Sequence, residues 1–133
     1  MKIVLDANIF ISSFFWGGNP RMVLERVIEG IDELFITREI LSEIRDVIGR
    51  PKFHADGDKI NYFMNLIEAI ANRIVSKRKI DNGSRDKSDK KYIEGGLTAQ
   101  VDYIISGDIH LLEMNEYENI RIVTAKEYLE IIK

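Results

Sequence analysis

Short apolar runs alternate along the chain with longer segments in which apolar residues recur every three or four positions. The run Ile3–Leu5 has the length and composition of a strand that is buried on both faces. Similar runs at residues 34–36, 74–75, 103–105 and 120–123 predict four more strands. Because helical patterns separate these runs, we expect an α/β fold, a three-layer α/β/α sandwich with a central five-stranded parallel sheet.

The helical patterns are bounded by residues that commonly begin or end helices. Thr37 is expected to cap one helix and Gly49 to close it, and Gly30 is expected to close another. Helices are predicted at residues 9–15, 20–29, 38–48, 58–72, 88–100 and 125–132. No internal repeat or linker interrupts the pattern, so residues 1–133 are interpreted as a single domain.

Composition narrows the class of protein. Apolar residues make up 45% of the chain and charged residues 31%, which is ordinary for a soluble globular protein. The absence of cysteine excludes disulfides and thiolate metal sites. No apolar run has membrane-spanning length and no secretory signal is visible, so a cytoplasmic location without membrane contact is expected. The net charge of −3 argues against a generally basic nucleic-acid-binding surface, but allows a local basic patch.

Two carboxylates follow predicted strands closely. Asp6 comes directly after the first strand, and Asp108 follows the strand at residues 103–105. Ligand sites in open α/β sheets form at the carboxyl ends of the strands, so both side chains are expected at one crevice. Taken alone, either residue is more typical of a helix cap or a turn.

Two further acids lie on helices at positions that face inward. Asp89 falls near the middle of the apolar stripe of its helix, where an uncompensated charge would be costly. Glu43 lies on the flank of the stripe of its helix, whereas Glu39 and Asp46 are farther towards solvent. Four carboxylates from distant segments at one crevice predict a site for Mg²⁺ or Mn²⁺, because these ions prefer oxygen ligands. Such sites hydrolyse phosphodiesters.

The motifs resemble those of the PIN domain family, which includes the VapC-type toxins of toxin–antitoxin pairs. The resemblance extends over nearly the whole chain, and residues 102–108 are its most specific segment. Its other carriers are residues 5–9, Glu43, residues 85–93, Leu111-Leu112 and residues 122–129.

The resemblance implies a Mg²⁺- or Mn²⁺-dependent endoribonuclease for single-stranded RNA. It also implies a homodimer and an antitoxin protein as a possible partner. Asp6, Glu43, Asp89 and Asp108 would form the acidic cluster, and Asn8 and Ser106 would orient ligands or water. Asp86 is the alternative to Asp89 as the third acid, since this stretch is usually more acidic than here.

Basic and aromatic residues add candidates for RNA contact. Residues 77–91 are rich in lysine and arginine, so they form either an RNA-binding patch or a solvated loop. The candidates in it are Arg85, Lys87, Lys90 and Lys91, to which Arg50 and Lys52 could add. For the run Phe14-Phe15-Trp16 core packing is expected, with base stacking or a dimer interface as alternatives.

Other functions were compared with this interpretation. A catalytically inactive PIN-like module that binds RNA or a protein is the main alternative, favoured if Asp89 does not reach the site. A phosphorelay receiver needs an aspartate after its third strand, where Ser76-Lys77 stands here. A haloacid-dehalogenase-like phosphatase needs a second aspartate at the position of Asn8. Both of the latter are disfavoured.

Overall fold

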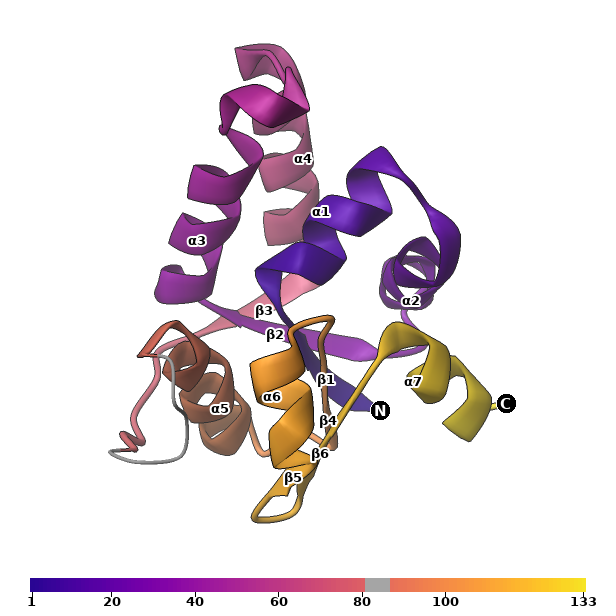
Figure 1. The fold of residues 1–133 in the computed structure, drawn as a ribbon, viewed down its shortest axis with the longest axis vertical. Coiled ribbons are helices and arrows are strands. Elements are labelled where there is room, and N and C mark those ends of the chain that lie inside the picture. Colours follow the sequence, from indigo (N-terminus) through magenta and orange to yellow (C-terminus); the bar gives the residue numbers. More distant parts are fainter. Residues whose placement is uncertain (81–86) are drawn as a thin grey trace.

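The computed structural model describes residues 1–80 and 87–133, and its centre is a six-stranded sheet (Figure 1). The strand order is β3-β2-β1-β4-β6-β5, in which the first five strands are parallel and β5 is antiparallel to β6. The strands are β1 (Lys2–Leu5), β2 (Glu33–Thr37), β3 (Ala71–Ile74), β4 (Tyr103–Ile105), β5 (Glu116–Tyr117) and β6 (Ile120–Val123).

Helices surround this sheet on both sides. In Figure 1, α3 and α4 lie above β2 and β3, α1 lies above β1, and α5 lies below β2 and β3. The helices are α1 (Ala7–Phe15), α2 (Gly18–Ile28), α3 (Arg38–Ile48), α4 (Gly57–Ile70), α5 (Lys87–Ala99), α6 (Ile109–Met114) and α7 (Ala125–Ile131), with a 3₁₀ turn η1 (Pro51–Phe53). The predicted α/β class and its central parallel sheet are therefore confirmed. Within the described residues, no helix is long and apolar enough to cross a lipid bilayer.

The structure differs from the sequence prediction at the edges of the sheet. The third strand was predicted at Ile74-Val75, but β3 begins at Ala71, and Val75 is exposed beyond its end. The sixth strand, β5, was not predicted because its two residues carry no periodic pattern. Both edges are polar or short: Asn72 and Arg73 of β3 are exposed.

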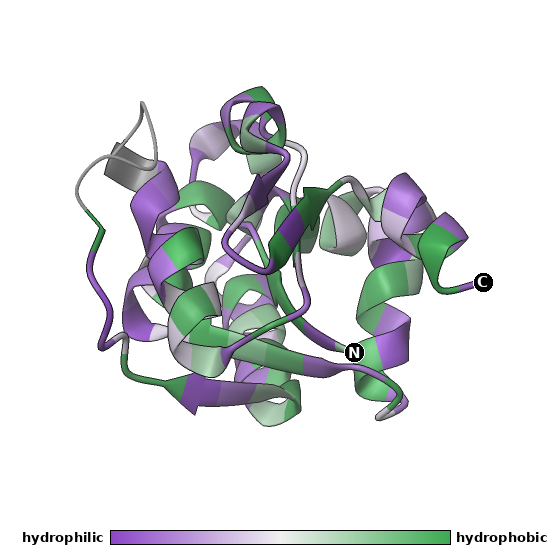
Figure 2. Cartoon of the chain, turned by 90° about the horizontal axis from the view of Figure 1, so that it is seen from below, coloured by the Kyte–Doolittle hydropathy of each residue, from purple (hydrophilic) through white to green (hydrophobic). Residues whose placement is uncertain are grey.

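The apolar residues of β1 are fully buried at the centre of the molecule. Ile3, Val4 and Leu5 are at most 1% exposed, because β1 lies between β2 and β4 and helices cover it. The surrounding helices carry both hydrophobic and hydrophilic residues along their length (Figure 2), as expected for elements that pack on one side and meet water on the other. The carboxyl end of β1, from which Asp6 follows, is thus paired with β4 at the centre of the sheet.

Candidate active site

The parallel pairing of β1 with β4 brings the first two predicted acids to the same edge of the sheet. Leu5 and Ile105 are in register, and the backbone N–H of Asp6 donates to the carbonyl of Ile105 at 3.1 Å. Asp6 is the N-cap of α1, and Asp108, three residues beyond β4, is the N-cap of α6. Each of the two residues therefore caps a helix, as expected when it is considered alone. Each also lies beyond the end of a strand, as expected for the site.

Asp6 is buried and held by three donors. Its Oδ1 accepts from the Ile9 N–H at 3.0 Å, and its Oδ2 accepts from the hydroxyl of Ser106 and from the Gly107 N–H at 3.2 Å. The Ser106 hydroxyl oxygen also accepts from the Asp108 N–H at 2.9 Å. Ser106 therefore fixes the orientation of Asp6 and connects it to the loop that carries Asp108.

The charge on Asp6 is unfavourable in this environment. Burial raises the pKa of the Asp6 carboxyl above its ordinary value, although hydrogen bonds from Ser106, Ile9 and Gly107 act in the opposite direction. The negative charge of Asp108 raises this pKa further. A cation between the two carboxylates would stabilise their ionised forms.

Glu43 reaches the same place from α3, through contacts with α5. The hydroxyl of Tyr92 donates to Oε2 of Glu43 and accepts from the Ala7 N–H at 3.0 Å. Lys91 Nζ lies 3.3 Å from Oε1 of Glu43. Burial raises the pKa of the Tyr92 phenol, and its hydrogen bond to Glu43 adds to this shift, so the hydroxyl stays protonated and remains a donor.

Three predicted acids line one small open cavity of about 170 Å³: Asp6, Glu43 and Asp108. The exposed residue Asn8 lines it as well, as does Arg50, which adds a positive charge to its wall. Three segments that are distant in sequence thus contribute carboxylate oxygen atoms to one cavity.

Asp89 has the predicted inward orientation. It is 1% exposed at the start of α5, and it is not among the residues that line the cavity. The next residue in the chain, Lys90, is half-buried, and Lys91 is engaged with Glu43. The remaining candidates, Asp86 and Arg85, lie outside the described residues, as does the side chain of Lys87.

The residues present suit a hard divalent cation. The acidic side chains of the cavity offer oxygen atoms only, which is the chemistry that Mg²⁺ and Mn²⁺ prefer. Within residues 1–80 and 89–133, no three acidic or histidine side chains are close enough together to enclose an ion. Mg²⁺ does not require such a cage, because it commonly uses one or two carboxylates and keeps several water ligands.

Comparisons with known proteins agree with this architecture. A family model described as PIN domain matches residues 2–110. A chain of the crystal structure of VapBC2 from Rickettsia felis, bound to a DNA fragment from their promoter, has the same fold, with a TM-score of 0.62 and 10% sequence identity. That match covers 92% of this chain and 97% of the other. A comparison with curated proteins gives no match. Since the family model spans most of the sequence, the chain belongs to the PIN domain family.

Proposed function

We propose that this protein is a Mg²⁺- or Mn²⁺-dependent endoribonuclease that hydrolyses single-stranded RNA. The observation that carries the proposal is the convergence of Asp6, Glu43 and Asp108 on one cavity at the carboxyl ends of parallel strands. These residues come from the end of β1, from α3 and from the loop after β4, so it is the folding of the chain that brings them together. Membership of the PIN domain family supports the same function.

The proposed ligands of the ion are Asp6 and Asp108, with Glu43 in the same cavity and the buried Asp89 as a fourth acid. When bound, the divalent ion would polarise the phosphoryl oxygen and lower the pKa of a bound water. The donors around Asp6 keep its carboxylate in a fixed orientation, because Ser106 and Gly107 both bind Oδ2.

The other residues of the cavity have roles that follow from their chemistry. The guanidinium of Arg50 can bind a phosphate through two parallel N–H donors. The exposed amide of Asn8 can donate to a phosphate or to water at the rim. Lys90 and Lys91, with Arg85 and Lys87, are proposed to attract the RNA backbone electrostatically.

Conservative substitutions of the acids test this function. With Mn²⁺ or Mg²⁺ and a pool of single-stranded RNA, Asp6→Asn and Asp108→Asn are each expected to reduce cleavage about 100-fold or more, because each removes a charge that binds the ion. Glu43→Gln should also reduce it. Glu39→Gln is the matched control, since Glu39 is exposed one turn earlier on the same helix. Equal cleavage by the wild type and by Asp6→Asn would exclude the assignment of Asp6.

One pair of observations favours a second candidate, an inactive PIN-like module that binds RNA or a protein. Lys91 partly neutralises Glu43, and Asp89 does not line the cavity. Titration with Mn²⁺, followed by calorimetry and by thermal unfolding, separates the two functions. A nuclease should bind the ion and gain stability from it. Absence of Mn²⁺ binding by a folded protein would favour the inactive module.

We further propose that the protein is a cytoplasmic toxin that forms a homodimer and is neutralised by an antitoxin protein. Similarity to the fold of VapBC2 supports this assignment. Expression of the wild type should arrest growth, expression of Asp6→Asn should not, and co-expression of a neighbouring small gene should relieve the arrest. Sedimentation of the purified protein tests the dimer. Normal growth with high levels of active enzyme would contradict the toxin role.

A further inference from the structure

A second open cavity, of about 420 Å³, adjoins the acidic one. It is lined by Asn8, Ile11, Ser12, Trp16, Lys52 and Phe53. Asn8 lines both cavities, so they share a wall at the first turn of α1. The two cavities therefore meet at Asn8, and together they are called the groove.

The wall at that end is aromatic and open to solvent. Trp16 is 70% exposed, whereas Phe14 and Phe15 pack against the core as expected. The ring centroids of Trp16 and Phe53 are 6.1 Å apart at an interplanar angle of 60°. Phe53 also stacks on Phe15, with centroids 5.1 Å apart and planes at 14°. Phe15 and Phe53 thus support a large apolar ring that the fold leaves uncovered.

Each of the two cavities has a positively charged residue in its wall. Arg50 lines the acidic cavity and Lys52 the aromatic one, on either side of Pro51 at the start of η1. Lys52 Nζ is 5.1 Å from the Phe53 ring centroid. From Asn8 to Trp16 the helix axis advances about 12 Å at its usual rise. The two cavities thus place carboxylates and Arg50 on one side of Asn8, and Lys52 with the aromatic rings on the other, which suits a metal ion and a phosphate at one end and a base at the other.

We infer that the cavity between Trp16 and Phe53 is a base-binding subsite. It would hold an unpaired base of a single-stranded nucleic acid whose backbone passes Arg50 and Lys52. The inference rests on the proposed function for its ligand class and adds the residues that bind it. Aromatic rings stack on any base, and a duplex keeps its bases inside, so the subsite selects unpaired strands without selecting sequence.

The sequence contains one tryptophan, so its fluorescence reports on this subsite directly. The protein is titrated in EDTA, so that no cleavage occurs, with a short oligoadenylate, with a duplex of equal length, and with polyphosphate. The single strand is expected to quench Trp16, and the other two probes are expected to leave the signal nearly unchanged. The quenching should persist at moderate salt, since stacking is screened less than phosphate contacts. Equal quenching by polyphosphate would overturn the subsite, because that probe has no bases.

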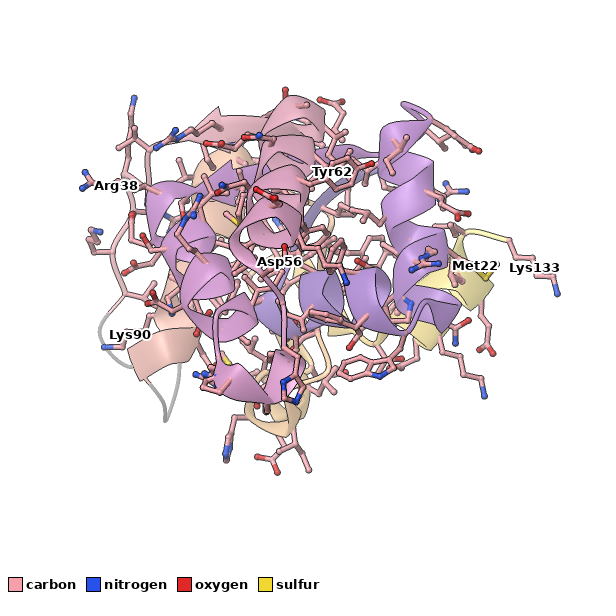
Figure 3. All side chains as sticks on the ribbon, turned by 90° about the horizontal axis from the view of Figure 1, so that it is seen from above. Met22, Arg38, Asp56, Tyr62, Lys90 and Lys133 are labelled. Carbon is pink, nitrogen blue, oxygen red and sulfur yellow. The ribbon has the colours of Figure 1, made fainter. Side chains whose placement is uncertain are left out.

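Variants show how much Trp16 contributes to the affinity for single strands, which is measured by the fluorescence anisotropy of a labelled oligoadenylate. Trp16→Ala should weaken binding about 5- to 100-fold, the usual range for one lost stack, and Trp16→Phe should recover most of it. Tyr62→Ala is the matched control, because Tyr62, on α4 (Figure 3), is 68% exposed and lines neither cavity of the groove. Circular dichroism and thermal unfolding show whether each variant folds. Unchanged affinity of folded Trp16→Ala would overturn the inference.

The two proposals fail in different ways. Quenching of the wild type and weaker binding by Trp16→Ala, with no RNA cleavage by the wild type in Mn²⁺, would support the subsite and reject the nuclease. Cleavage by the wild type with the same KM in Trp16→Ala would support the nuclease and reject the subsite. A shift in wild-type Trp16 fluorescence with protein concentration alone, together with loss of dimers in Trp16→Ala by sedimentation, would instead identify the face as a contact between two copies.

Discussion

The hydroxyl group of Tyr92 on α5 connects three segments of the site, α1, α3 and α5. Tyr92 is buried, and its ring belongs to the hydrophobic core, but its oxygen contacts the Glu43 carboxylate and the Ala7 N–H. The Ala7 N–H belongs to the first turn of α1, where no intrahelical acceptor is available. One phenol therefore satisfies a helix terminus and positions an acid of the cavity.

Removal of this hydroxyl tests the connection. Tyr92→Phe keeps the ring but leaves the Ala7 N–H buried without its acceptor, which should lower the free energy of unfolding by about 1–3 kcal/mol. Urea denaturation measures the change. Tyr62→Phe, at an exposed position, should change it little. An unaltered midpoint in Tyr92→Phe would show that the contact contributes nothing to stability.

The residues of the site differ in how well the sequence identifies them. Asp6 and Asp108 were predictable because a strand end fixes where the next side chains lie. For Asp89, helical periodicity gave the correct inward orientation, but it contains no information about which neighbour the side chain meets. Tyr92 was missed because hydropathy patterns register an aromatic ring and not the direction of its hydroxyl. The only available signal was the choice of Tyr over Phe at a buried position.

At the scale of elements, two glycines let α5 approach the sheet closely. A Cβ atom at Gly96 would lie 3.2 Å from Ile120 Cδ1 and 3.2 Å from Val101 Cγ2. A Cβ atom at Gly95 would lie 3.3 Å from Thr37 Cγ2. Since α5 carries Tyr92 and Lys91 to Glu43, this close packing determines how far their side chains reach.

Alanine substitutions separate helix propensity from packing. Gly96→Ala should destabilise the protein by about 1–3 kcal/mol, because crowding in a packed core exceeds the gain in helix propensity. Gly57→Ala is the matched control in the first turn of α4, where nothing lies within 4 Å of the added atom. Gly57→Ala should raise the free energy of unfolding by about 0.4–1 kcal/mol. Thermal unfolding checks both, and a more stable Gly96→Ala would show that α5 can move away at low cost.

The elements themselves were predictable where burial is complete. β1 and β4 are continuous apolar runs, and their positions agree with the prediction. β3 was displaced because only its backbone pairing with β2, from Leu34↔Ala71 to Thr37↔Ile74, defines its limits, and two of its four side chains are exposed. The short α6 and β5 depend on tertiary contacts that no local pattern contains.

At the scale of the whole molecule, a buried carboxylate links segments far apart in the chain. Asp32 is 3% exposed between α2 and β2. Its Oδ2 accepts from Arg26 Nε at 2.8 Å and from the Tyr128 hydroxyl of α7 at 2.8 Å. Burial alone would raise the pKa of Asp32, but the hydrogen bonds from Arg26 and Tyr128 outweigh it and lower the pKa below its ordinary value.

This lowered pKa gives a pH dependence of known sign. A carboxyl whose pKa is lower in the folded state contributes stability above its unfolded pKa of about 3.9, and loses that stability as the pH falls through the folded value. At neutral pH, Asp32→Asn should therefore be less stable than the wild type. The difference in urea midpoint should shrink as the pH falls below about 4. A difference that stays constant down to the acid limit of folding would show that the charge of Asp32 is not responsible.

The two margins of the sheet have a consequence for how copies of this protein can associate. One margin carries the polar strand β3, with exposed Asn72 and Arg73, and the other is the two-residue strand β5. A charged side chain or a very short strand discourages backbone pairing with a neighbour, which protects against aggregation. A continuous sheet across two molecules is therefore disfavoured, and any stable pair would be held together by helix surfaces, leaving the parallel core untouched.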